Sequence, residues 1–257
     1  MNTQHIETTS GHWLLAKVGK KVLRPGGRLL TGKLLNSLNI SKEDRVVELA
    51  PGLGYTAKKI LESQPQSYTG IDADEDAVQL LKRKIIGKQV EFKLANARET
   101  GLQEDFASKI LGEAMLTMQA PHRKKEIVQE VYRVLKKGGL YGIHELALIP
   151  DEISAKHKKS LEYDLAQSMK VNARPLTTSE WKSLLEEVGF KIVKVEYADM
   201  KLLQPERIIE DEGFLRFLKI AKNVLLNPDI KKRIIHMRST FKKYETNLKA
   251  IMIIAQK

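Results

Sequence analysis

The sequence predicts an α/β protein with a doubly wound, mostly parallel seven-stranded sheet, an antiparallel last strand, and cap helices at the N-terminus and late in the chain. Three observations predict this fold. Short runs rich in strand-forming residues alternate with helical patterns through the middle of the chain, and a glycine turn joins the first run to a helix. The 257 residues, 42% of them hydrophobic, can bury one large core. Strands alternating with helices form βαβ units with right-handed crossovers.

The strands are expected where aliphatic, β-branched and aromatic residues cluster between turn-forming residues. They are predicted at residues 45–49, 67–71, 90–94, 106–111, 140–146, 190–197 and 250–255. Helical spacing of apolar residues predicts the helices 56–64, 74–86 and 123–136. The last of these is expected to stop at Gly138-Gly139.

After the fifth strand the chain changes character. Residues 151–170 are predicted to form a charged helix, and residues 178–188 a helix capped by Thr178 or Ser179 and ended by Gly189. Apolar side chains then recur at helical spacing through residues 206–248. These segments are expected as helices added to the α/β core.

The composition excludes several classes of protein. Cysteine is absent, which rules out disulfides, thiolate metal sites and a cysteine nucleophile, and no cluster of metal ligands stands out. No apolar run approaches the roughly 18–20 residues that span a bilayer. The first residues lack a basic segment followed by an apolar one, as a secretory signal would have. We therefore expect a cytoplasmic protein without a metal.

The net charge of +12 is concentrated in two segments. Residues 11–33 hold six basic residues and no acidic one, and residues 219–257 hold ten basic and two acidic ones, so the rest of the chain is near neutral. A basic excess favours an anionic partner. The late basic segment fits a solvated face, a lid over an anionic small molecule or lipid head group, or an RNA- or membrane-binding surface.

The strongest local motif is a glycine loop after the first predicted strand, Glu48-Leu-Ala-Pro-Gly52-Leu-Gly54. Gly52 and Gly54 let the backbone approach a ligand and allow positive φ. Such a loop lies at the carboxyl edge of an open α/β sheet, where ligands bind, and Asp72 at the end of the next strand can accept both hydroxyls of a ribose. The pattern Gly-x-Gly-x-x-Ala also fits a dinucleotide site. Glu48, however, would repel a pyrophosphate and suits an amino-acid ammonium group.

Four motifs in order resemble the class I S-adenosylmethionine-dependent methyltransferases, in particular the small-molecule group of ubiquinone/menaquinone type. The glycine loop is similar to the family's first motif, and residues 70–74 to its second. Residues 130–140 are similar to its late helix–turn–strand segment, and residues 176–193 to its last helix and strand. The resemblance covers residues 45–197 and the closing strand. It implies a Rossmann-like fold and S-adenosylmethionine as cofactor.

The resemblance assigns cofactor-binding roles to positions that match the family's motifs. They are Glu48, Ala50, Gly52, Gly54, Asp72, Ala73, Asn96, Ala97 and Glu113. Asn96 stands where the family usually has an acid, so a weaker contact to adenine is expected. In related enzymes a helix ahead of the first strand folds over the cofactor, which suggests Gly26 and Gly27 there, with Arg24 or Arg28 reaching a carboxylate. An ordinary helix end with a Pro-Gly turn explains the same residues.

Methyl transfer from a sulfonium is an in-line displacement that needs alignment of the acceptor and exclusion of water. A general base is needed only if the acceptor carries a proton, so the catalytic residues stay open. Glu113, His144 and Glu145 are candidates because they follow the fourth strand or lie in the fifth, near the ligand edge. Hydrogen bonding, capping or salt-bridging is the more common role of such residues. His12 and Trp13 are expected in the acceptor pocket.

We expect one methyltransferase domain over residues 1–257, acting on a small-molecule acceptor, with an anionic one suggested by the charge. Its parts are cap helices (1–40), the cofactor-binding core (41–150), helical insertions (151–175 and 204–248), and the closing helix and strands (176–203 and 249–257). The alternatives are an RNA methyltransferase that uses the basic segments, a cofactor-binding regulator without activity and, more remotely, an NAD-dependent oxidoreductase. Nucleic acid is a less favoured partner because aromatic residues, at 6%, are sparse. The oligomeric state stays open.

Overall fold

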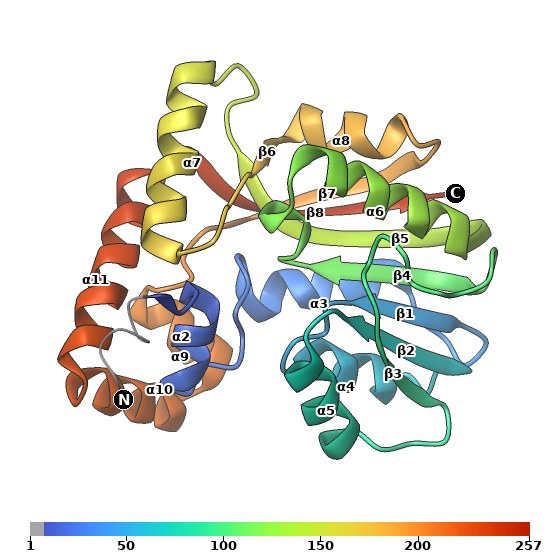
Figure 1. The fold of residues 1–257 in the computed structure, drawn as a ribbon, viewed down its shortest axis with the longest axis horizontal. Coiled ribbons are helices and arrows are strands. Elements are labelled where there is room, and N and C mark those ends of the chain that lie inside the picture. The colour runs from blue at the N-terminus through green and yellow to red at the C-terminus, as the bar shows by residue number, and fades with distance from the viewer. Residues whose placement is uncertain (1–7) are drawn as a thin grey trace.

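The computed structural model describes residues 8–257, and a single mixed sheet is its centre (Figure 1). The strand order is β3-β2-β1-β4-β5-β8-β7, with the short β6 paired to β5. The bounds are β1 (Arg45–Leu49), β2 (Ser67–Asp72), β3 (Val90–Leu94), β4 (Ala107–Glu113), β5 (Leu135–Leu148), β6 (Leu176–Thr177), β7 (Lys191–Asp199) and β8 (Leu248–Gln256).

The direction of the strands confirms the predicted fold class. Strands β1 to β5 pair in parallel, and β8 is antiparallel to both β5 and β7. The order reverses between β1 and β4, where the chain crosses to the other half of the sheet. In a sheet of this kind a ligand binds outside the carboxyl ends of the strands at that reversal.

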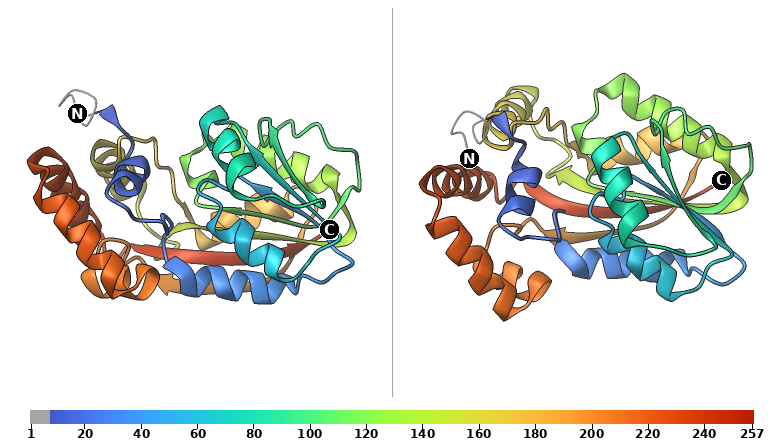
Figure 2. Two further views of the ribbon diagram at one scale, coloured as in Figure 1. Left: turned by 90° about the horizontal axis from the view of Figure 1, so that it is seen from below. Right: turned by 60° about the horizontal axis from the view of Figure 1, so that its bottom comes forward.

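Helices cover both faces of the sheet (Figure 2). The buried side chains of α3 (Gly27–Leu38), α4 (Tyr55–Glu62) and α5 (Glu75–Lys84) share one core cluster with β1–β3 and β8. Those of α6 (Pro121–Val134) and α8 (Thr178–Glu186) form a second cluster with the inner strands. The two apolar faces of the sheet are thereby both buried, as a parallel sheet requires.

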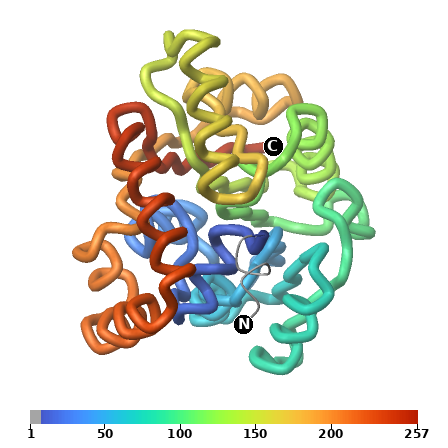
Figure 3. Tube along the Cα trace, turned by 60° about the vertical axis from the view of Figure 1, so that its left-hand side comes forward, coloured from blue at the N-terminus to red at the C-terminus, as the bar shows by residue number. Residues whose placement is uncertain are grey.

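The remaining helices gather beyond the carboxyl ends of the parallel strands, where they form a cap (Figures 1 and 3). They are α2 (Gly11–Lys17), α7 (Ala155–Met169), α9 (Pro205–Glu212), α10 (Phe214–Leu225) and α11 (Pro228–Lys243), and a short 3-10 helix, η1 (Leu116–Met118), follows β4. A third core cluster joins the cap to the ends of β5 and β8. No helix within residues 8–257 is long and apolar enough to cross a membrane.

Three details of the predicted elements are wrong. Helix α6 ends at Val134, and Gly138-Gly139 lies inside β5. The reason is pairing: Leu135 already pairs with Ala107 of β4, and the glycine pair exchanges backbone hydrogen bonds with Lys257.

The second difference is the cap of α8. It is Thr177, whose hydroxyl accepts the Glu180 N–H while the Glu180 carboxylate accepts the Thr177 N–H. This reciprocal pair satisfies two donors that the first turn of a helix otherwise leaves free. The third difference is the number of strands, because the two residues of β6 add an eighth strand beside β5.

Candidate active site

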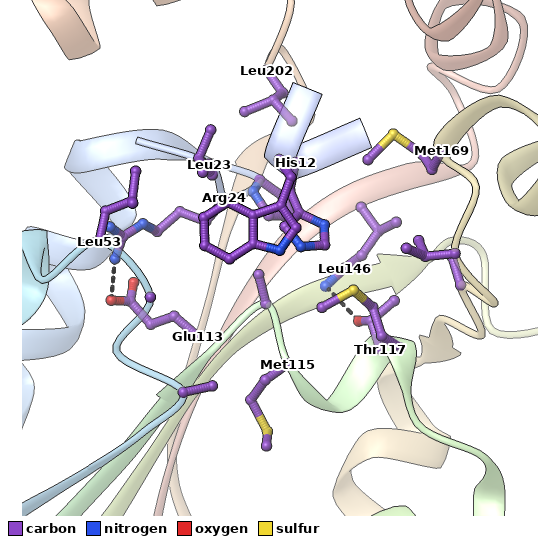
Figure 4. Close-up of a pocket in the computed structure, with 18 of the residues that line it drawn as sticks. His12, Leu23, Arg24, Leu53, Glu113, Met115, Thr117, Leu146, Met169 and Leu202 are labelled. Carbon is purple, nitrogen blue, oxygen red and sulfur yellow. Dashed lines mark hydrogen bonds and ion pairs between the residues drawn. The ribbon is translucent and has the colours of Figure 1, made fainter. Parts of the chain in front are cut away.

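A cavity of about 340 Å³ lies between the carboxyl edge of the sheet and the cap (Figure 4). Its volume is in the range of about 300–1,000 Å³ usual for small-molecule sites. One half is lined by the ends of β1, β2 and β4 and their loops. The other half, which we call the far half, is lined by the cap and the end of β5: His12, Trp13, Leu146, Leu165, Met169, Val171, Ala173, Met200, Leu202 and Phe241.

The glycine loop shapes the first half. Ala50, Gly52 and Gly54 all have positive φ, and the Ala50 N–H donates to the Ile71 carbonyl at 2.7 Å. A Cβ at Gly52 would have the Ala50 carbonyl oxygen, 3.9 Å away, as its nearest neighbour. A Cβ at Gly54 would lie 2.6 Å from the Leu81 side chain of α5. Gly52 therefore leaves open space that a ligand can enter, whereas Gly54 lets the helix pack against the loop.

Glu48 is a buried carboxyl group in the wall of the cavity. The Tyr68 hydroxyl donates to its Oε2 at 2.6 Å. Burial raises the pKa of Glu48 to about 8, against the opposing effect of the Tyr68 hydrogen bond. A cation placed beside this group would favour its ionised form, so Glu48 suits the ammonium group of an amino acid.

Asp72 also lines the cavity, at the end of β2. Its carboxylate accepts the N–H of Asp74 at 3.1 Å and that of Gly52 at 3.4 Å, and burial raises its pKa. Asn96 uses its side-chain oxygen to accept the Arg98 N–H in an exposed turn. The structure thus brings Glu48, Ala50, Gly52, Asp72 and Glu113 around the cavity. Gly54, Ala73, Asn96 and Ala97 lie outside its lining.

Glu113 is surrounded by donors. It is contacted by Arg24, Thr31, Thr56 and His144, the hydroxyls of Thr31 and Thr56 each at 2.6 Å. Burial alone would raise the pKa of Glu113, but Arg24 and His144 outweigh it and hold the pKa well below its usual range. The carboxylate is therefore an ionised anchor for the segment around Arg24. Arg24 does reach a carboxylate, as the sequence suggests, but the carboxylate belongs to the protein.

His144 lies inside the sheet and is fully buried. Its Nδ1 is 2.7 Å from Glu113, and its Nε2 bonds to the Pro25 carbonyl. Both ring nitrogens are thus occupied by protein groups, and His144 is absent from the cavity lining. This geometry ties β5 to the N-terminal segment.

Glu145 is turned to the other face of β5. Its carboxylate accepts the backbone N–H groups of Met115, Leu116 and Thr117 and the Thr117 hydroxyl, at 2.7 to 3.0 Å. These bonds fix the loop after β4, which supplies Met115 and Thr117 to the cavity. Glu145 itself has no place in the lining, so it positions residues that do.

Gly26 and Gly27 begin α3 with positive φ. A Cβ on Gly27 would lie 2.3 Å from Oδ1 of Asp211, which accepts the Arg28 N–H at 2.8 Å. Neither glycine lines the cavity. Asp211 of α9 occupies the space that Gly27 leaves, whereas Ala250 and Leu30 pack against Gly26. The preceding Arg24 and Pro25 are the residues that reach the cavity.

His12 and Trp13 of α2 both line the cavity, with ring centroids 5.5 Å apart. Burial lowers the pKa of His12, so the imidazole is neutral at neutral pH. The other residues of the far half come from segments spread between residues 146 and 241 and escaped the sequence analysis. Leu165, Met169 and Phe241 carry only the signal of helical apolar periodicity, which does not distinguish a cavity wall from a core. The others lie in β5 or in loops, where that signal is absent.

The first half of the cavity has the chemistry that S-adenosylmethionine requires. A buried carboxyl group near the end of β1 could face a cation, a carboxylate at the end of β2 can accept hydroxyls, and Gly52 leaves the backbone approachable. Within residues 8–257 no group of three His, Asp or Glu side chains is arranged to hold a metal.

Comparison with known proteins agrees with this geometry. A family model described as "Methyltransferase domain" matches residues 46–139. An uncharacterised protein of Haemophilus influenzae is 32% identical over 251 residues, which are 96% of this chain and 98% of that protein. A ribosomal RNA small subunit methyltransferase A of Maridesulfovibrio salexigens is 35% identical, but only over 31% of each chain.

Solved structures share the fold at low sequence identity. The [4+2]-cyclase SpnF superposes with a TM-score of 0.73 at 16% identity, covering 99% of this chain and 93% of its own. Phosphoethanolamine N-methyltransferase 2 of Haemonchus contortus, in complex with phosphomonomethylethanolamine and S-adenosylhomocysteine, superposes with a TM-score of 0.72 at 16% identity. This match covers all of our chain and 57% of that one.

The order of the strands, the glycine loop at the reversal point and the matched domain together define a class of protein. The chain belongs to the class I S-adenosylmethionine-dependent methyltransferases. It is therefore an enzyme, and its cofactor is S-adenosylmethionine. The uncharacterised Haemophilus influenzae protein is a relative over nearly the whole length of the chain.

Proposed function

We propose that the enzyme methylates an uncharged, largely apolar small molecule held in the far half of the cavity. The observation that carries this proposal is the lining itself. Eight of the ten residues of the far half are aliphatic, Met or Phe side chains, and no Lys, Arg, Asp or Glu is among them. Small-molecule sites are typically apolar with a few polar groups that fix orientation. The lining favours an uncharged acceptor over the anionic one that the charge distribution suggested.

The charged residues of the cap support the same conclusion. The lysines of α10 and α11 are exposed on the outside of the cap, away from the cavity. The two basic side chains that do line the cavity, Lys21 and Arg24, belong to the segment between α2 and α3, and Arg24 is paired with Glu113. Apart from these two side chains, the basic charge of the chain lies outside the cavity lining.

We propose that Glu48, Ala50, Gly52 and Asp72 hold the cofactor, with Glu48 at its ammonium group and Asp72 at its ribose. When bound, S-adenosylmethionine supplies a methyl group already activated on its sulfonium. We assign an indirect role, shaping the loops after β1, β2 and β3, to Gly54, Ala73, Asn96 and Ala97. Glu113 holds Arg24 and Pro25 over the cavity, and the cap excludes water from the acceptor.

We propose His12 as the general base for an acceptor that must lose a proton. It lines the far half, and the lowered pKa of its buried ring keeps it in the neutral form that accepts protons. Glu113, His144 and Glu145 serve this role less well because their polar atoms are bonded to protein groups. Their proposed role is to position the loops and the N-terminal segment.

The proposal is tested by methyl transfer from labelled S-adenosylmethionine to a panel of acceptors. The panel holds neutral phenols and quinols, their phosphorylated or carboxylated analogues, and total RNA. We expect transfer to a neutral apolar compound, with kcat/KM at least about tenfold lower for its charged analogue. Transfer only to anionic compounds or only to RNA would contradict the assignment. Tight binding of S-adenosylhomocysteine without turnover of any acceptor would favour the non-catalytic regulator.

A substitution in the far half tests acceptor binding separately from cofactor binding. Met169→Lys places a charge among apolar side chains, so it should raise KM for the acceptor by about tenfold or more. It should leave the affinity for S-adenosylhomocysteine, measured by calorimetry, within about twofold of the wild type. Glu152→Ala, at an exposed position ahead of α7, is the matched control. Equal KM values for Met169→Lys and the control would show that the acceptor does not bind in the far half.

A further inference from the structure

The outer surface of the cap carries a row of apolar side chains that no part of residues 8–257 covers. On α10 and its last turn these side chains are between 47 and 83% exposed: Phe214, Leu215, Leu218, Leu225 and Leu226. Single exposed apolar residues are common on proteins, but a contiguous group of large ones marks an interaction surface. We call this group the α10 face.

The α10 face is a single stripe. At 100° per residue, the five side chains fall within about 120° of one another around the helix axis. Ile220, the buried residue of α10, lies on the opposite side and packs into the third core cluster. Helix α10 therefore has two apolar faces, one that holds it to the cap and one that is exposed to solvent.

Basic side chains flank this stripe. Lys219 and Lys222 lie within or beside the same arc, and α10 contains no acidic residue. On the neighbouring α11, Lys231, Lys232, Arg238 and Lys242 are exposed, and Asp229 is the single acid of that helix. None of these six cations takes part in an ion pair among the described residues. Figure 3 shows α10 and α11 together on the side of the molecule that the cap forms.

We propose that the α10 face docks on the surface of an anionic lipid bilayer. A helix that joins an apolar stripe to lysines and arginines lies in the plane of the interface, with its apolar side in the acyl boundary. Each Lys or Arg near an anionic leaflet adds about 1 kcal/mol of attraction. This complementarity selects the bilayer over a second copy of the chain, because two such faces would bring twelve unpaired cations together. The proposal stands independently of which acceptor the enzyme methylates.

The experiment is sedimentation of the purified protein with vesicles. We expect binding to vesicles of 70% phosphatidylcholine and 30% phosphatidylglycerol, much weaker binding to pure phosphatidylcholine, and release from the mixed vesicles in 0.5 M salt. Two double variants test the apolar and the charged contributions of the surface separately. Leu215→Ser with Leu226→Ser removes apolar contact, and Lys219→Glu with Lys222→Glu reverses charge. Each should lower the partition coefficient by about tenfold or more.

Matched controls carry changes of the same kind outside the α10 face. Leu29→Ser removes an exposed leucine of α3, and Lys82→Glu with Lys88→Glu reverses two exposed, unpaired lysines at and after α5. Both should bind vesicles as the wild type does. All substituted positions are exposed, so the melting temperatures should match, and this is checked for each variant.

Three results would overturn the proposal. The first is no binding to the anionic vesicles, or equal loss in the α10 variants and the controls. The second is a concentration-dependent dimer, seen by sedimentation velocity, that Leu215→Ser with Leu226→Ser dissociates, because it would assign the face to a second copy. The third is a gel shift with RNA that depends on Lys219 and Lys222, together with no binding to vesicles, because it would assign the surface to RNA.

Discussion

At the level of single residues, Glu48 couples the proposed cofactor site to pH. Its pKa of about 8 means that the free enzyme holds a proton there at pH 7. An ammonium group beside it favours the ionised form, so binding should release close to one proton. We predict that affinity for S-adenosylhomocysteine rises between pH 6 and 7.5, approaching tenfold per pH unit. Calorimetry at pH 7 in two buffers of different ionisation enthalpy measures the proton count.

The variant Glu48→Gln is the control for this coupling. It keeps the size of the side chain and the contact with Tyr68 but cannot ionise. We expect weaker binding that no longer depends on pH and releases no proton. A wild-type enzyme that binds without releasing a proton would place the ammonium group away from Glu48.

His12 gives a second pH-dependent prediction, on the rate. Because burial lowers its pKa, His12 becomes protonated only below its ordinary value of 6.5. The kcat for a proton-bearing acceptor should therefore stay level near neutral pH and fall below pH 6.5. His12→Gln should lower kcat by about 100-fold or more and leave the affinity for S-adenosylhomocysteine unchanged. The control His122→Gln, at an exposed position of α6, should change neither kcat nor that affinity. A fully active His12→Gln enzyme would exclude His12 as the base.

The two loop glycines should differ in what their substitution costs. The added methyl group of Gly52→Ala would enter open space. The substitution should therefore lower the free energy of unfolding only by the cost of a left-handed backbone at a non-glycine residue, about 1–2 kcal/mol. Gly54→Ala adds a clash with Leu81 and should cost about 2–4 kcal/mol in all. Urea unfolding of the ligand-free proteins measures both free energies. Equal losses would mean that α5 can move away from Gly54 at little cost.

At the level of elements, the loop between β4 and η1 depends on one carboxylate. Glu145→Ala leaves the N–H groups of Met115, Leu116 and Thr117 buried without their acceptor. Since an unsatisfied buried donor costs about 1–3 kcal/mol, we predict a loss of at least about 3 kcal/mol of unfolding free energy. Glu152→Ala should change it by less than about 0.5 kcal/mol. A stable Glu145→Ala protein would show that water replaces the carboxylate.

The sequence placed most strands within a few residues because their apolar runs and turns are local features. The error at the end of α6 has a long-range cause. The helix ends where Leu135 pairs with Ala107, and Gly138-Gly139 is held inside β5 by hydrogen bonds to Lys257. Such long-range contacts override the local signal of a glycine pair.

At the level of the whole molecule, the cavity is shared between the sheet and the cap, so a ligand that fills it should stabilise the fold. At 100 times its dissociation constant, S-adenosylhomocysteine should add about 2.7 kcal/mol. For a chain of this size the melting temperature should then rise by about 5–10 °C. Differential scanning calorimetry measures the shift. Gly52→Asp, which fills the open space with a negative charge, should abolish it, and a shift equal to that of the wild type would place the cofactor elsewhere.

The sequence by itself predicted the α/β fold and the carboxyl edge as the ligand site, because periodicity, turns and the glycine motif are local patterns. The cofactor followed from the resemblance of four such motifs to the methyltransferases. Only the tertiary structure decided what Glu113, His144 and Glu145 do, because their partners come from distant segments; His144 bonds to Pro25, 119 residues away. It also placed the lysines of α10 and α11 on the outer surface and built the far half from apolar side chains. Helical periodicity reports that a side chain is covered, whereas folding decides whether a core, a cavity or a bilayer covers it.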